Sequence, residues 1–259
     1  MSHRDLKSAS IHDLIGNLDA FLEPGRYRDY GPNGLQVPGP DEIVTVVTGV
    51  SAHVELFERA AELDADLVLT HHGILWDRAP RRIDEPMKRR LKLLFDHDMA
   101  LAAYHLPLDG HLEAGNNALL AKGLGATALE PFAEHGTATI GVAARFAEPL
   151  ARDELLARVE RLCGQEPLAF PYGPDPVASI GIVSGAGSDY LAEAADRGLD
   201  AFLTGEPTER AMADARERDL TYVAAGHYAT EVLGVRGLGE RLAARFNVRH
   251  EFIEVSNPV

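Results

Sequence analysis

Short apolar strands that alternate with amphipathic helices constrain the fold of this chain more than any other feature of its sequence. Residues 44–50 are rich in valine and predict a strand, residues 54–63 have the apolar spacing of a helix, and residues 67–70 predict a short buried strand. The same order returns later, with strands expected at residues 180–184, 201–204 and 222–225. Strands separated by helices fold into sheets that helices cover. The sequence therefore predicts the α/β class, with mixed sheets covered by helices.

The chain is expected to form two interlocking α/β lobes. A less regular section, residues 126–176, separates the two alternating parts and ends in the turn-rich run PYGPDP. We therefore predict a first lobe at residues 1–125 and a second lobe at residues 126–259. Residues 46–72 and 180–206 resemble each other weakly. Either a duplication or the general likeness of strand–helix–strand units explains this repeat.

The chain is strongly acidic. Its formal net charge is −15, and lysine occurs only at positions 7, 88, 92 and 122. Nucleic acid is a poor partner for such a chain, because phosphates need a basic surface. One hypothesis is a halophilic source with a high-salt cytoplasm, where salt screens the repulsion between carboxylates. A melting temperature that does not rise between low and molar salt would contradict it.

The composition also indicates where in the cell the protein is expected. Cys163 is the only cysteine, which excludes an internal disulfide and a thiolate metal cluster within one chain. No run approaches the ~20 consecutive apolar residues that a membrane span needs. Residues 1–7 lead into an amphipathic pattern and not into the apolar segment of a signal peptide. We therefore expect a cytoplasmic protein without a membrane partner.

Two adjacent histidines, His71 and His72, directly follow the apolar strand at residues 67–70, and Gly73 comes next. On a continuing strand, neighbouring side chains point to opposite faces. We expect the chain to turn at Gly73, so that both rings can serve one site at the end of the strand. The alternative, which an isolated dipeptide favours, is a surface pair in a loop.

A second strand end carries residues of similar chemistry. The strand expected at residues 99–104 ends at His105, and Asp109 follows in the run HLPLD. Histidine and carboxylate are ligands that divalent metals accept. The alternative for Asp109 is a turn, because Asp109–Gly110 is a common turn pair.

A third strand end leads into a helix expected at residues 227–246. His227 and Glu231 are four residues apart, so they share one face of that helix. Such a spacing makes a compact pair of metal ligands. The alternative is an ordinary pair on a helix surface, with Glu231 stabilised by the helix dipole near the N-terminus.

The combination of three strand ends favours a metal site over the separate alternatives. Five imidazole and carboxylate groups exceed the needs of one tetrahedral ion, and carboxylates can bridge two cations. The pattern therefore predicts a dinuclear centre with two divalent ions per chain, formed by His71, His72, Asp109, His227 and Glu231. Zinc, iron, manganese and nickel all suit such donors.

Five motifs, in order along nearly the whole chain, resemble the NGG-interacting-factor-three-like family, of which some members are catalogued as GTP cyclohydrolase 1 type 2 homologues. They are NGLQV at residues 33–37, THHG at 70–73, HLPLD at 105–109, TGE at 204–206 and GHYATE at 226–231. The chain is similar to the shorter members, which lack a large central insertion. The stretch RDYGPNGLQV departs from the usual spacing of the first motif, which leaves the contacts of the N-terminal loop open.

The resemblance implies the two-lobed fold of this family, a dinuclear metal centre and a ring-shaped homohexamer. It implies that Glu231 bridges the two ions, that His72 and Asp109 bind one ion, and that His71 and His227 bind the other. The GHYATE motif of the second lobe would then return to a site shared with the first lobe.

Two further residues are candidates for moving protons. The resemblance places His105 beside the metal centre. Glu206 has two interpretations: it faces the same cleft and orients water, or it is a carboxylate at a helix N-terminus before Pro207.

The first functional hypothesis is a metal-dependent hydrolase whose small-molecule substrate is a nucleotide or related heterocycle. Metal-activated water would attack carbon or phosphorus, and His105 or Glu206 would move protons. A GTP substrate rests on the resemblance alone, because SGAGS at residues 184–188 lacks the lysine of a phosphate-binding loop. The alternative is a non-catalytic, hexameric metal-binding scaffold that interacts with other proteins.

Overall fold

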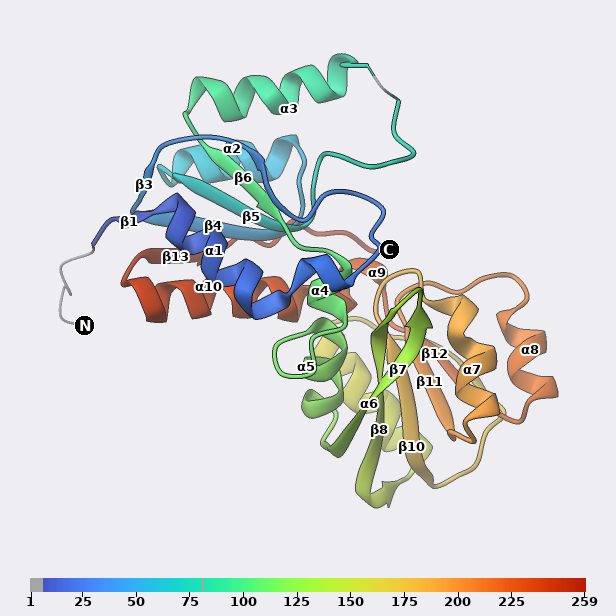
Figure 1. Ribbon diagram of the computed structural model, residues 1–259. Coiled ribbons are helices and arrows are strands. Elements are labelled where there is room, and N and C mark those ends of the chain that lie inside the picture. Colours follow the sequence, from blue (N-terminus) through green and yellow to red (C-terminus); the bar gives the residue numbers. More distant parts are fainter. Residues whose placement is uncertain (1–6, 81) are drawn as a thin grey trace. The chain divides into compact units, whose positions relative to one another are not determined.

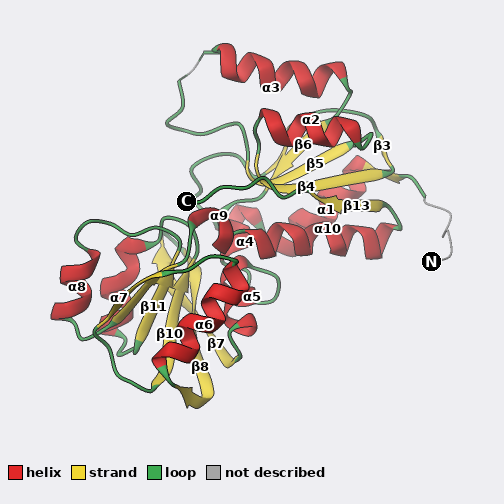
Figure 2. Cartoon of the chain, turned by 180° about the vertical axis from the view of Figure 1, so that it is seen from behind, coloured by secondary structure: helices red, strands yellow, loops and turns green. Residues whose placement is uncertain are grey.

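The structure, a computed structural model, describes residues 7–80 and 82–259 in two compact units (Figure 1, Figure 2). Unit 1 consists of the chain up to Leu108 and of Val235–Ser256, and unit 2 consists of Asp109–Gly234 and Asn257–Val259. Residues 1–6, on which the expected absence of a signal peptide partly rests, lie outside the described residues. Within the described ranges, no helix has both the length and the apolar character needed to cross a membrane.

Unit 1 contains a five-stranded sheet in the order β13-β4-β5-β6-β2. Four of its strands are parallel: β4 (Thr45–Ser51), β5 (Leu67–His72), β6 (Ala100–Ala103) and β13 (Arg249–Phe252). The edge strand β2 (Gly34–Val37) runs antiparallel to β6. Because parallel neighbours end at the same edge of a sheet, the residues at the ends of β5 and β6 are brought together.

Helices cover both faces of the unit 1 sheet, as parallel strands require. α2 (Val54–Glu62) and α3 (Glu85–Asp96) lie on one face, and α1 (Ile11–Leu22) and α10 (Val232–Phe246) lie on the other (Figure 1). Leu56 and Phe57 of α2 pack into a core with Val47 and Val68 of the sheet. The short elements before the sheet are β1 (Ala9–Ser10), η1 (Pro24–Arg26) and β3 (Glu42–Ile43).

Unit 2 contains a six-stranded mixed sheet in the order β7-β8-β10-β11-β12-β9. Its centre is parallel and consists of β10 (Val177–Val183), β11 (Ala201–Thr204) and β12 (Thr221–Ala224). The hairpin β7 (Ala126–His135) and β8 (Ala138–Leu150) and the edge strand β9 (Leu168–Pro171) add antiparallel pairings. The unit 2 sheet therefore combines parallel and antiparallel neighbours.

Helices also cover both faces of the unit 2 sheet (Figure 2). α5 (Asn116–Gly123) and α6 (Arg152–Cys163) lie on one face, and α7 (Leu191–Asp196) and α8 (Ala211–Glu217) lie on the other. The core beneath α5 and α6 is mainly aliphatic and includes Val142, Leu155, Val159 and Ile180. Three short helical elements complete the chain: α4 (Leu106–Asp109), η2 (Ser188–Tyr190) and α9 (His227–Thr230).

The predicted α/β class with mixed, helix-covered sheets is confirmed. The division into units differs from the predicted boundary between residues 125 and 126. α5 packs against β7 and β8, so the chain enters unit 2 at Asp109. β13 pairs with β4, so the last strand belongs to unit 1. β13 and β4 are about 200 residues apart in the sequence. Their pairing therefore leaves no local sequence pattern from which the boundary between the units could be predicted.

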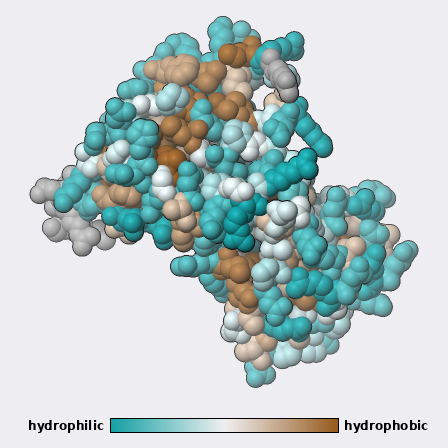
Figure 3. Space-filling view, in the orientation of Figure 1, coloured by the Kyte–Doolittle hydropathy of each residue, from teal (hydrophilic) through white to brown (hydrophobic). Residues whose placement is uncertain are grey.

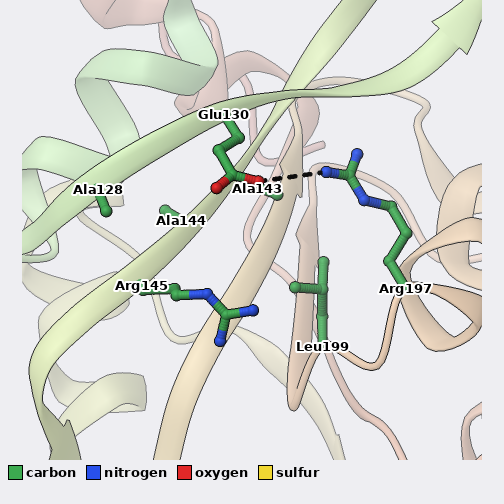
Figure 4. Close-up of a pocket in the computed structure, with 7 residues that line it drawn as sticks. All are labelled: Ala128, Glu130, Ala143, Ala144, Arg145, Arg197 and Leu199. Atoms are coloured by element: carbon green, nitrogen blue, oxygen red, sulfur yellow. Dashed lines mark ion pairs between the residues drawn. The ribbon is translucent and has the colours of Figure 1, made fainter.

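The surface is mainly hydrophilic on the face shown in Figure 3, as expected for a chain with 25% charged residues. Unit 2 has a surface pocket of about 210 Å³ beside β7 and β8, where Arg145 and Arg197 extend over small side chains (Figure 4). Arg197 and Glu130 form an ion pair there, with 3.7 Å between nitrogen and oxygen. The predicted site residues are not part of this lining, so the candidate site is elsewhere.

Candidate metal centre

Three imidazoles meet at the edge of the unit 1 sheet where β5 and β6 end. His71 and His72 are the last residues of β5, and His105 follows β6 closely. The ring centroid of His71 is 4.7 Å from that of His72 and 5.0 Å from that of His105. The centroids of His72 and His105 are 5.5 Å apart. Each ring offers a nitrogen within 4.8 Å of the others, which suits a metal ion.

β5 includes both histidines, whereas we expected the strand to end before them. Ser51 of β4 pairs with His72, and its Oγ lies 3.0 Å from Nδ1 of that ring. The strand ends immediately before Gly73, where a side chain would collide with the amide of Gln36. Oε1 of Gln36 accepts the backbone N–H of Ile74 at 2.9 Å. The missing side chain at Gly73 therefore lets Gln36 fasten the loop that follows β5.

Hydrogen bonds determine which nitrogen His71 and His105 present. Nδ1 of His71 lies 2.9 Å from the carbonyl oxygen of Tyr104, and Nδ1 of His105 lies 2.7 Å from Oδ1 of Asp29. Carbonyl and carboxylate oxygens only accept hydrogen bonds, so Nδ1 carries a proton in both rings. In the neutral ring the lone pair is then on Nε2, which is the atom that such a histidine offers to a metal.

Asp29 holds His105, although no sequence pattern indicates it. Its side chain is 3% exposed. Oδ1 accepts Nδ1 of His105 and the N–H of Tyr30, both at 2.7 Å, and Oδ2 accepts Nδ2 of Asn33 and the N–H of Leu106, both at 2.9 Å. Burial raises the pKa of Asp29, but the hydrogen bonds from His105, Asn33 and Tyr30 outweigh burial and hold the pKa below its ordinary value. Asp29 therefore stays ionised and fixes the ring of His105.

Replacing Asp29 with asparagine is expected to destabilise the metal-free protein by about 3 kcal/mol, because an amide NH₂ would face two N–H donors and leave them without an acceptor. Urea unfolding measures this loss, and nitrogen NMR of the imidazoles reports the tautomer of His105. Asp41→Asn, at an exposed position, is the matched control. It should change the free energy of unfolding by less than about 0.5 kcal/mol. Equal stability of the two variants would contradict the role of Asp29.

In unit 2, His227 lies between two carboxylates. Nε2 of His227 is 3.2 Å from Oε1 of Glu231, and Nδ1 is hydrogen-bonded to Oε1 of Glu206. The side chain of Glu231 is 3% exposed and that of Glu206 is 40% exposed. The sequence left two interpretations for Glu206, a carboxylate that orients water or one at a helix N-terminus. The structure places Glu206 on the ring nitrogen of His227 that faces away from Glu231.

The four-residue spacing brings His227 and Glu231 together, but not on the single helix expected at residues 227–246. α9 ends at Thr230 and α10 begins at Val232, so Glu231 lies at the break between them. One turn of helix before the break is enough to place Glu231 beside His227.

Asp109 is the last residue of α4 and is 6% exposed. Its Oδ1 accepts Nδ2 of Asn116 at 2.8 Å and Oγ of Ser184 at 2.9 Å. Asn116 belongs to α5, and Ser184 is the first residue of the SGAGS run that follows β10. Two donors on one oxygen fix the carboxylate, as supporting hydrogen bonds do for metal-binding carboxylates.

The neighbouring carboxylates raise the proton affinity of His227. Burial lowers the pKa of the ring, but the hydrogen bonds and charges of Glu231 and Glu206 outweigh burial and raise the pKa to about 9. At neutral pH the metal-free protein therefore carries protons on both nitrogens of His227. A metal ion that binds Nε2 has to displace one of them.

Metal affinity is therefore expected to rise as the pH increases to about 9, by up to about tenfold per pH unit, because the metal and one proton compete for His227. Calorimetric titration of the metal-free protein with Mn²⁺ at several pH values measures the affinity and the proton release. Glu206→Gln removes one of the groups that raise the pKa, so the rise should end at a lower pH. An affinity that stays constant from neutral pH to about pH 9 would contradict this competition.

Each unit offers donors that divalent metals accept. Unit 1 has the three imidazoles at the sheet edge. In unit 2, Nε2 of His227 lies 3.2 Å from Oε1 of Glu231, and Asp109 is a further buried carboxylate. Imidazole nitrogen and carboxylate oxygen suit zinc, iron(II), manganese and nickel. The residues present therefore fit the predicted divalent metals.

Comparison with known proteins decides the family. The family described as Duf34/NIF3 (NGG1p interacting factor 3) matches residues 9–258. The chain belongs to the Duf34/NIF3 family. The resemblance inferred from the five sequence motifs is thereby confirmed.

Individual proteins similar to this chain match it over nearly their whole length. The chain is 39% identical over 249 residues to the GTP cyclohydrolase 1 type 2 homolog of Pseudomonas aeruginosa, which covers 96% of this chain and 98% of that protein. It is 42% identical over 246 residues to the GTP cyclohydrolase 1 type 2 homolog of Vibrio cholerae, and this match covers 93% of this chain and 96% of that protein. A solved structure of protein ybgI, described as of unknown function, is similar with a TM-score of 0.91 and 36% identity, and covers 97% of this chain and 100% of that chain.

Proposed function

We propose that this Duf34/NIF3 protein binds two divalent metal ions and is a hydrolase that acts on a nucleotide or related heterocycle. The orientation of the imidazoles carries the proposal. Two of the proposed ligands, His71 and His227, each direct Nδ1 to an oxygen that only accepts hydrogen bonds. Rings held in this way are prepared to offer Nε2 to a cation. The names of the relatives, GTP cyclohydrolase 1 type 2 homologs, support the substrate class.

The proposed ligands are the five residues predicted from the sequence. By the family resemblance, Glu231 would hold both ions, His72 and Asp109 would hold one of them, and His71 and His227 would hold the other. Glu231 and Asp109 are 2% and 6% exposed. Buried carboxylates need cationic or hydrogen-bonding partners, so their burial supports this assignment. Zinc, iron, manganese and nickel are all candidates.

The remaining residues of the site have distinct proposed roles. Divalent ions, when bound, supply Lewis-acid activation of water and of the substrate. His105 transfers a proton through Nε2, because Asp29 holds Nδ1. Glu206 positions the ring of His227 through Nδ1, which is a more specific role than orienting water. A cyclohydrolase reaction requires attack at the purine C8 atom, so GTP is the first substrate to test.

Metal analysis of anaerobically purified protein tests the proposal, followed by assays of GTP, other nucleotides and phosphodiesters with each metal found. We expect two ions per chain, and turnover that is lost in His72→Ala and Asp109→Asn. Turnover that survives in these variants, or in metal-free protein, would contradict the mechanism. If metal raises the melting temperature but none of these compounds is consumed, the alternative of a non-catalytic scaffold is favoured.

We also propose that the protein is a cytoplasmic homohexamer, as the family resemblance implies. Ile83, two residues before α3, and Phe95, near the end of that helix, are 68% and 62% exposed in the single chain. Exposed apolar side chains of this size support association with further copies. Light scattering measures the mass of the assembly. A melting temperature that rises from low to molar salt would support the halophilic source that the charge of −15 suggests.

A further inference from the structure

Two aromatic side chains of unit 1 lie beside the three imidazoles and have no role in the proposed proton transfer or metal binding. The ring of Trp76 is 5.2 Å from that of His105, at an angle of 86°, and 5.8 Å from that of His72. The ring of Tyr30 is 6.2 Å from that of His105. Tyr30 is 48% exposed. Aromatic surface that water can reach therefore borders the imidazole cluster.

The loops that carry these rings are fixed to each other. The N–H of Asp77 donates to the backbone oxygen of Tyr30 at 2.8 Å. Nε1 of Trp76 donates at 3.1 Å to the backbone oxygen three residues before it. Gly31 packs so closely on Leu75 that a side chain at Gly31 would collide with the Leu75 carbonyl. The backbone that carries both rings, and the ring of Trp76 itself, are therefore held in position before a ligand arrives, which lowers the entropic cost of binding.

The space beneath these loops is too small for a substrate. The pocket lined by Asn33, Gln36, Trp76, His105 and their neighbours has a volume of about 10 Å³. Such a volume holds about one water molecule. A ligand that reaches the imidazoles from this side therefore lies against the exposed parts of the aromatic rings. A planar ligand makes the largest contact with such surfaces.

We infer that Trp76 and Tyr30 form a platform on which the substrate stacks a planar heteroaromatic ring, next to the imidazoles. The inference rests on the proposed function and names the residues that recognise the substrate. Aromatic side chains bind nucleobases by stacking, with little preference among bases. Recognition through the ring also suits a chain with a net charge of −15, in which SGAGS lacks a phosphate-binding lysine.

The fluorescence of Trp76 provides a direct test, because it is the only tryptophan in the sequence. Metal-free protein is titrated with guanosine, and with ribose 5-phosphate as the control that lacks a base. We expect guanosine to quench Trp76 emission in a saturable manner and ribose 5-phosphate to leave the emission unchanged. Tyr30→Leu should weaken guanosine binding roughly tenfold, whereas Tyr30→Phe should retain it. Tyr172→Leu, next to β9 in unit 2, is the matched control and should also retain it.

Three results would overturn the inference: no saturable quenching by guanosine, equal quenching by ribose 5-phosphate, or unchanged guanosine binding in Tyr30→Leu. Metal content is measured in the same variants and separates this inference from the proposed function. Tyr30→Leu should keep the metal content of the wild type, because Tyr30 is not a proposed ligand. Normal metal content and turnover without guanosine quenching would refute the platform alone. Saturable guanosine binding by a protein that binds no metal would refute the proposed hydrolase and leave the platform intact.

Discussion

Glu231→Gln is expected to reduce the bound divalent metal from two ions per chain to one or none. Glutamine has the shape of glutamate but no charge, and the side chain of Glu231 is 3% exposed, so water cannot readily replace the lost carboxylate. Loss of a residue that merely supports a ligand costs ~10–100-fold in metal affinity, and loss of the proposed bridging ligand should cost at least about 100-fold. Metal content after dialysis, together with calorimetric titration, measures the effect.

Two further measurements make the result specific to Glu231. NMR titration of the metal-free variant should show that the pKa of His227 falls from about 9, because Glu231 supplies the largest contribution that raises it. The same spectra show whether the variant is folded. Glu209→Gln, at an exposed position, is the matched control and should keep both ions and the raised pKa. If Glu231→Gln retained two ions per chain, Glu231 would not be a ligand.

The imidazoles of unit 1 could be predicted because their positions follow from local patterns. β5 and β6 are short apolar runs, and each is followed or ended by histidine in the sequence. Parallel strands end at one edge of a sheet, so the local pattern places His71 and His72 at that edge, whereas the family resemblance was needed to place His105 beside the metal centre. The sequence did not show that β5 continues through both histidines, because histidine has no strong preference for strand or loop. The pairing of His72 with Ser51 extends the strand.

The residues that hold the candidate ligands could not be predicted in the same way. Asp29 lies in a loop 76 residues before His105. Loops carry no hydrophobic period, so a single carboxylate in a loop gives no signal. The residues that hold Asp109 give no signal either. Asn116 is seven residues from Asp109 and Ser184 is 75 residues from it, and only the folding of unit 2 brings both donors to Oδ1 of the carboxylate. Their roles follow from tertiary structure alone.

Gly185→Ala is expected to lower metal affinity by about 100-fold or more, whereas Gly198→Ala should leave it unchanged. Both glycines have positive φ, 62° at Gly185 and 67° at Gly198. Alanine in this left-handed region costs about 1–2 kcal/mol at either position. A Cβ atom at Gly185 would lie 3.1 Å from Nε2 of His227 and closer still to Oε1 of Glu231, but a Cβ atom at Gly198 meets open space. Both variants therefore carry similar backbone strain, but only Gly185→Ala places a methyl group against the proposed ligands His227 and Glu231.

Urea unfolding of the two metal-free variants separates two costs: both variants lose stability through backbone strain, and Gly185→Ala should lose more, because its methyl group also collides with Oε1 of Glu231. Metal content and calorimetric affinity then measure the effect of the added methyl group alone. Because the backbone N–H of Gly185 donates to Oγ1 of Thr230 at 3.0 Å, just before Glu231, the backbone cannot readily move the methyl group away. Equal metal affinity in the two variants would show that Nε2 of His227 and Oε1 of Glu231 do not bind the metal where they approach Gly185.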